Sequence, residues 1–251
     1  NKGPSVSHSV KRHGRVRFDP GHRQQAREVA KQAEAAIDTV MAAAVAGQSA
    51  DGGMLADAAA AEIDTLSSDL ENTLSAAFES EADPTLAEQA LKNALLGMSI
   101  SIELGLDFDN TVAVGISGCL QNVGLTQLPA SIRQADRALR VSETLELQKV
   151  PKKSLELLER MQGVPNIVPT VVYQVYERPD GTGYPRGLKG RSIHLFARAL
   201  QVSNLYVEMT HATPRRPALM PYSAALHLLR QANAHKVDAE IVRNMLHVTS
   251  L

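Results

Sequence analysis

The chain has 251 residues, 44% hydrophobic and 21% charged, which predicts one large domain or two small ones with enough apolar residues to form a core. A formal net charge of −1 and an aromatic content of 4% argue against a nucleic-acid partner, and the single cysteine, Cys119, excludes an internal disulfide and is interpreted as a core residue. No apolar run reaches the roughly 18–20 residues that span a bilayer, and no signal-peptide core begins the chain, so we expect no membrane span and a cytoplasmic location.

The first segment, residues 1–25, is basic and rich in turn-forming residues. Such an arm could bind an anionic partner or a membrane surface. The alternative is a solvated and partly disordered lead-in, which is the usual behaviour of termini and the interpretation we favour.

Residues 26–82 are predicted to form N-terminal helices. An apolar face repeats at helical spacing, and Gly47 with the run SADGG ends this first helix. A second helix carries apolar residues from Leu55 to Phe78 on one side and acidic residues on the other. We expect a helical hairpin that packs on the rest of the chain or, through its small-residue faces, on a second copy in a homodimer.

Residues 83–251 also read as helical. Asp83-Pro84 is predicted to start one helix and Asp109 another, while prolines divide the chain that follows into short helices. A long apolar helix is expected over residues 193–211, and Ser223 and Asp238 are predicted caps of two final helices. The expected fold is therefore all-α, a helical bundle preceded by the N-terminal hairpin.

The loop ERPDGTGYPRGLKG, residues 177–190, combines several turn-forming features. Asp180 can accept a hydrogen bond from its own backbone, and Gly181 and Gly183 supply dihedral angles that other residues disfavour. Pro185 fixes the exit of the turn, and Tyr184 offers a flat ring with a polar tip. Followed by an apolar helix, this combination is specific.

The loop, with ARALQVSNLYVEMTHATPRRP and GCLQNVGLTQLP, resembles the HD-GYP domain of the HD phosphohydrolase superfamily from about Thr85 to Ser250. This resemblance implies an HD-domain-like helical bundle over 83–251. Members of that family hydrolyse the bacterial messenger cyclic di-GMP with two or three metal ions. The resemblance therefore implies a place in cyclic di-GMP signalling.

The chain departs from the family pattern at the metal-binding positions. The family's His-Asp pair corresponds to Gln121 and Asn122, and its aspartate on the helix after the loop corresponds to Asn204. Its histidines correspond to Gln89, Val150, Val175 and Tyr176. Leu125 also stands where the family has a substrate-binding lysine. The chain is thus interpreted as a degenerate HD-GYP domain.

These substitutions remove the chemistry of a metal-dependent hydrolase. A two-metal site needs charged and imidazole ligands, whereas valine has no donor atom and neutral amide oxygens are poor ligands for transition metals. We therefore predict a pseudoenzyme with no catalytic residue, no bound metal and no cofactor. A relocated metal site at Glu208 and His211, three residues apart on one helix, with Glu177 nearby, is the less favoured alternative.

Three functions stay open, in this order. The first is a protein-interaction or regulatory module that binds a diguanylate cyclase or another signalling domain. Its interaction loop would comprise Glu177, Asp180, Gly181, Gly183, Tyr184, Pro185, Arg186 and Lys189. The second is a non-hydrolysing sensor of cyclic di-GMP or a related nucleotide, with Arg215 and Arg216 as phosphate contacts. The third is a residually active phosphodiesterase.

Overall fold

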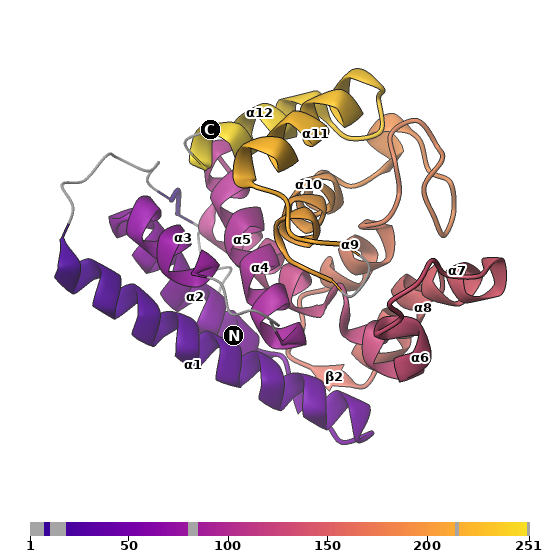
Figure 1. Ribbon diagram of the computed structural model, residues 1–251. Helices are drawn as coiled ribbons and strands as arrows, with labels where there is room; N and C mark the ends of the chain where they lie inside the picture. The colour runs from indigo at the N-terminus through magenta and orange to yellow at the C-terminus, as the bar shows by residue number, and fades with distance from the viewer. Residues whose placement is uncertain (1–7, 11–18, 80–84, 214–215, 250–251) are drawn as a thin grey trace.

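The computed structural model describes residues 8–10, 19–79, 85–213 and 216–249. Nearly all of the regular structure in these ranges is helical, which confirms the predicted all-α class (Figure 1). The exception within them is one parallel pair of two-residue strands, β1 (Ala50–Asp51) and β2 (Met161–Gln162).

The first helix, α1 (Pro20–Val45), begins earlier than the predicted Ala26. Asp19 caps it by accepting a hydrogen bond from the Gly21 amide at 2.8 Å, and proline in the first turn has no amide hydrogen to leave unpaired. Part of the predicted basic arm is therefore helical. Residues 8–10 lie on the start of α5 (Phe108–Leu120), where the His8 ring stacks on Phe108. The rest of the arm, residues 1–7 and 11–18, lies outside the described residues.

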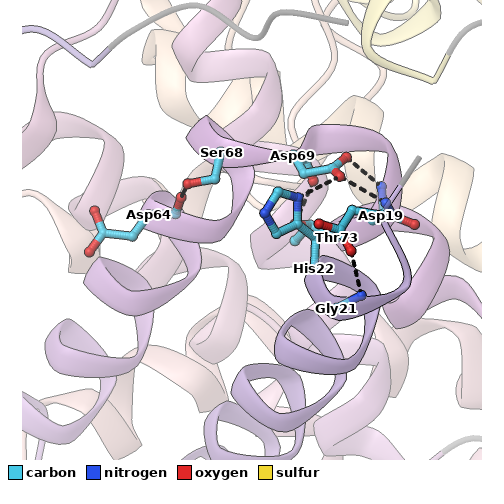
Figure 2. Close-up of polar contacts among 8 residues, drawn as sticks. Asp19, Gly21, His22, Asp64, Ser68, Asp69 and Thr73 are labelled. Atoms are coloured by element: carbon cyan, nitrogen blue, oxygen red, sulfur yellow. Dashed lines mark hydrogen bonds and ion pairs between the residues drawn. The ribbon is translucent and has the colours of Figure 1, made fainter. Parts of the chain in front are cut away.

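The predicted second helix is two helices, α2 (Gly53–Ser68) and α3 (Leu70–Phe78). Asp69 breaks the helical run because its backbone is extended and its carboxylate caps α3, accepting from the Asn72 amide at 3.1 Å. Figure 2 shows the same carboxylate facing His22 of α1, with a His22 Nδ1–Asp69 Oδ2 distance of 3.4 Å. This contact joins the start of α1 to the junction of α2 and α3.

The N-terminal helices share one core with the rest of the protein. They pack on α4 (Leu86–Glu103) and α5 (Phe108–Leu120), and the shared cluster includes Ile37 and Ile63 on one side and Leu95 and Ile116 on the other. The β1–β2 pair also links the α1–α2 connection to the chain after α8 (Val150–Leu158). The apolar faces of α1 and α2 are therefore largely buried within the chain, and a homodimer through these helices stays a prediction.

Short elements follow α5 and lead to the loop: η1 (Val123–Gln127), α6 (Ala130–Arg133), α7 (Val141–Leu147), α8 (Val150–Leu158) and α9 (Val168–Gln174). The loop ends in η2 (Gly190–Ser192), and then come α10 (Leu195–Thr210), α11 (Pro221–Asn233) and α12 (Ala239–Val248). These last three helices form a second apolar cluster against α4. In Figure 1 they lie on the side of α4 and α5 away from α1.

Several helix starts differ from the predicted ones. Asp238 caps α12 as expected, but α11 begins at Pro221 rather than at a Ser223 cap. The cap of α5 is Asp107, not Asp109, and α4 is capped by Thr85 with Glu88 in a reciprocal capping box. The predicted start at Asp83-Pro84 lies outside the described residues. At α4 and α5 the observed cap residue has the backbone angles and the acceptor that a cap requires, whereas Met220 before α11 forms no side-chain cap.

Candidate functional site

The loop over residues 177–190 is fixed by a buried carboxylate. Glu177 has no exposed surface, and its Oε1 and Oε2 accept hydrogen bonds from the amides of Arg186 at 2.7 Å and Leu188 at 2.8 Å. The side chain of Gln201 on α10 donates to the Glu177 carbonyl. Glu177 therefore holds the two arms of the loop together and anchors them to α10.

Two of the loop glycines are required by space and by backbone angle. A Cβ at Gly183 would lie 2.3 Å from the Arg178 nitrogen, and one at Gly181, where φ is +84°, would lie 2.5 Å from Lys189 Cε. Asp180 Oδ1 accepts from both the amide and the hydroxyl of Thr182, which lowers the Asp180 pKa, the amide contributing most. The turn predicted from these residues is thus formed by the expected means.

Tyr184 lies across the ring of Tyr176. The two ring centroids are 5.1 Å apart with the planes 15° from parallel, and burial raises the pKa of both phenols. Tyr184 is half-buried, whereas Pro185, Arg186 and Lys189 are exposed. The loop consequently presents one aromatic ring edge, a proline and two cations at the surface.

Four of the predicted former metal-ligand positions come together beneath this loop. Asn204 Oδ1 of α10 accepts from Gln121 Nε2 at 3.3 Å and from Asn122 Nδ2 at 3.0 Å, both at the end of α5. The Tyr176 hydroxyl donates to Asn122 Oδ1 at 2.5 Å. We use the name amide cluster for four residues: Gln121, Asn122, Asn204 and Asn93.

The fourth member of the amide cluster, Asn93, was not predicted from the sequence. It lies on α4, is 2% exposed, and its Nδ2 is 3.5 Å from Asn204 Oδ1. Its position four residues after Gln89, on the same face of α4, is the signal that could have indicated it. Gln89 itself is half-buried one turn earlier.

Two predicted positions do not join the amide cluster. Val175 packs in an apolar cluster with Phe196, and Val150 packs with Leu128 and Ile132. Both side chains are buried in these apolar clusters, so the two positions are part of the core.

The amide cluster carries no charge and does not fit a pair of transition-metal ions. Its side chains are neutral amides, and Asn93 Oδ1 and Gln121 Oε1 have no hydrogen-bond partner within the described structure. Neutral amide oxygens carry no negative charge to offset two divalent ions, and they are not the imidazole ligands that suit iron and zinc. In the part of the chain that is described, no three His, Cys, Asp or Glu side chains are grouped to hold a metal ion.

The residues of the alternative metal site are engaged elsewhere. His211 Nε2 lies 2.9 Å from Lys92 Nζ and its Nδ1 lies 2.5 Å from the Val207 carbonyl oxygen, so both ring nitrogens have partners. Burial lowers the His211 pKa, and Lys92 lowers it further. Glu208 is exposed and Glu177 is bound by the loop amides. Burial also raises the pKa of Cys119 to about 12, which makes it a poor nucleophile.

The predicted phosphate contact at Arg216 has a structural partner. Its guanidinium donates to the carbonyls of Met209 at 2.9 Å and Glu208 at 2.6 Å, at the end of α10. It thereby satisfies carbonyls that have no partner within the helix. Arg215 lies outside the described residues, so the phosphate contact stays a prediction.

Comparison with known proteins gives matches to one family. Residues 72–241 match the family described as HD domain. The chain is 28% identical over 162 residues to 3'3'-cGAMP-specific phosphodiesterase 1 of Vibrio cholerae, covering 62% of this chain and 37% of that protein. It is 26% identical over 133 residues to the cyclic di-GMP phosphodiesterase response regulator RpfG of Xanthomonas campestris, covering 53% and 35%. The chain thus spans about a third of the length of these curated relatives.

Among solved structures, the HDG"Y"P protein Bd1817 of Bdellovibrio bacteriovorus matches with a TM-score of 0.67 over 92% of this chain and 70% of that one. At 17% sequence identity this likeness shows a shared fold. Among the described residues, no helix has the length and apolar character needed to cross a bilayer.

Proposed function

Because the chain belongs to the HD domain family and has the HD-GYP-type domain, we propose that it is a catalytically inactive member that acts as a protein-interaction module. The amide cluster is the observation that carries this proposal. Gln121, Asn122 and Asn204, which we assign to the family's His-Asp pair and later aspartate, hydrogen-bond through Asn204 Oδ1. They bind one another rather than presenting charged ligands to a common point.

The chemistry of hydrolysis requires what these residues lack. In a two-metal phosphodiesterase the ions generate a hydroxide nucleophile and neutralise phosphate charge. Asparagine and glutamine cannot supply the compensating negative charge, and the Tyr176 hydroxyl, whose pKa is raised by burial, is a donor here rather than a base.

The loop has its full turn geometry although the proposed metal-ligand positions hold uncharged side chains. Glu177, Gly181 and Gly183 keep the contacts that define its shape, and Tyr184 keeps its position against Tyr176. A structured loop without catalysis favours a role in recognition, since aromatic and arginine side chains are frequent in protein interfaces.

The printed names of the relatives support a signalling context. They are cyclic di-GMP and 3'3'-cGAMP phosphodiesterases. We therefore place this chain in cyclic-dinucleotide signalling in the bacterial cytoplasm, with a diguanylate cyclase or another signalling domain as the expected partner.

Hydrolysis assays test the proposal. The purified chain is incubated with cyclic di-GMP or 3'3'-cGAMP and with added Mn²⁺ or Fe²⁺. The positive controls are RpfG of Xanthomonas campestris for cyclic di-GMP and the Vibrio cholerae relative for 3'3'-cGAMP. We expect no linear dinucleotide above the level of the buffer. Metal-dependent product that disappears with a chelator would overturn the proposal.

A further inference from the structure

A surface groove lies between α7 and the Tyr184–Pro185 turn of the loop. We call it the α7–loop groove. Leu145, Glu146 and Lys149 line one side, and Tyr184 and Pro185 line the other. It lies at the surface and does not include any member of the amide cluster.

The helix that forms one wall has an uncovered apolar side. No side chain of α7 is buried, and Val141 and Leu145, one turn apart, are 80% and 54% exposed. Leu147 at the end of the helix packs on the apolar cluster of Val150, and Arg137 donates to both oxygens of Glu143 at 2.7 and 2.8 Å. Short helices in proteins are normally retained by a packed apolar face. A partner's apolar side chain would therefore be buried on binding to the exposed Leu145 beside Tyr184 and Pro185.

The surroundings of the α7–loop groove are basic. Residues 136–153 and 178–191 contain nine lysine and arginine residues against four aspartate and glutamate residues, in a chain with a net charge of −1. Two of the four acids, Glu143 and Glu146, are paired with Arg137 and Lys149. Arg186 and Lys189 are exposed, and neither forms an ion pair with another described residue. The free charge at the rim is therefore positive.

We propose that the α7–loop groove binds an acidic peptide segment of a partner protein. A bulky apolar side chain of that segment lies between Leu145 and Tyr184, and carboxylates beside it face Arg186 and Lys189. This inference rests on the proposed function as an interaction module and assigns its partner a chemistry. Apolar contact supplies the affinity and charge supplies the selection of acidic sequences.

The lining favours a peptide over a phosphorylated ligand. Phosphate binding requires cations that converge on one point. Here the lysine inside the groove is already paired with Glu146 at 2.5 Å, and the unpaired cations lie at the rim around apolar groups. A second copy of the chain could also offer acidic and apolar groups, since Met54, Asp57 and Asp64 are exposed on α2. The experiment separates these occupants.

A phage-displayed library of random linear peptides, selected on the purified chain, tests the inference. We expect enriched peptides that combine aspartate or glutamate with a large apolar residue. Their affinity, measured by fluorescence anisotropy, should fall about tenfold or more in Leu145→Glu and in Arg186→Glu, and should weaken with added salt. Matched controls are Leu226→Glu and Arg230→Glu on α11, which change an exposed leucine and an exposed arginine elsewhere and should leave affinity unchanged.

Three results would overturn the inference. The first is a selection that enriches peptides without acidic residues or enriches none. The second is an equal loss of peptide affinity in the α11 controls. The third is a dimer, seen by analytical ultracentrifugation, that the groove variants dissociate. Binding to vesicles containing phosphatidylglycerol that is lost in Leu145→Glu, without peptide binding, would also overturn it. The hydrolysis assay on the same sample is independent, so failure here leaves the absence of catalysis standing.

Discussion

Replacing the buried carboxylate of the loop, Glu177→Gln, should destabilise the protein although the two side chains have nearly the same shape. Both carboxylate oxygens accept backbone amide hydrogens, from Arg186 and Leu188. Glutamine keeps one acceptor and turns an NH₂ group toward the other amide, in a site with no access to water. Since a hydrogen bond to a charged group contributes about 1.5–3 kcal/mol and a buried unpaired donor costs about 1–3 kcal/mol, we expect a loss of about 2–4 kcal/mol.

Urea unfolding followed by circular dichroism measures this loss, and amide hydrogen exchange at Arg186 and Leu188 reports whether the loop opens locally. For a chain of this size the melting temperature should fall by roughly 5–15 °C. Asp180→Asn is the matched control because its side-chain oxygen can still accept from Thr182. If Glu177→Gln unfolds within about 0.5 kcal/mol of the unchanged protein, Glu177 does not hold the loop as described.

Three other predictions follow from the buried polar groups. Burial raises the pKa of Glu62 from its ordinary value of 4.5 to about 7, so the folded state binds an extra proton between these pH values and stability should fall as pH rises through that window. Glu62→Gln should remove this slope, worth about 3 kcal/mol, in urea titrations at several pH values. An unchanged slope in the variant would show that another group is responsible. Asn204→Leu should lower the free energy of unfolding by about 2–4 kcal/mol because it leaves the Gln121 and Asn122 amide hydrogens unpaired. Asn204→Asp keeps an acceptor for both. Equal stability of the two variants would contradict the hydrogen bonding described for the amide cluster. Leu145→Glu should alter the free energy of unfolding by less than about 0.5 kcal/mol, because the side chain is 54% exposed, and a larger loss would mean that α7 is needed for folding.

The fold class could be predicted from the sequence because helical periodicity and turn residues are local properties. The loop illustrates this, since Asp180, Gly181 and Gly183 act as their residue types suggest. Helix boundaries were less predictable. Asp69 interrupts a continuous apolar pattern, and whether an aspartate caps or continues a helix depends on the His22 contact from a distant segment.

The candidate site could be predicted only through the resemblance. The assignment of Gln121, Asn122 and Asn204 to former ligand positions stays a prediction, and the structure adds that they lie within hydrogen-bond reach of one another. Asn93 was missed because its role depends on the packing of α4 against α10. The hydrogen bonds from Arg216 to the carbonyls of α10 could not be predicted either, since charged residues near a proline indicate no particular acceptor.

The metal content of the purified chain tests the central claim most directly. The protein is prepared without chelator, exposed to Mn²⁺ and Fe²⁺, desalted and measured by inductively coupled plasma mass spectrometry. Neutral amides at the positions predicted to match the family ligands lead us to expect far less than one metal ion per chain. A retained ion at one or more per chain, lost in Asn204→Leu, would contradict the account.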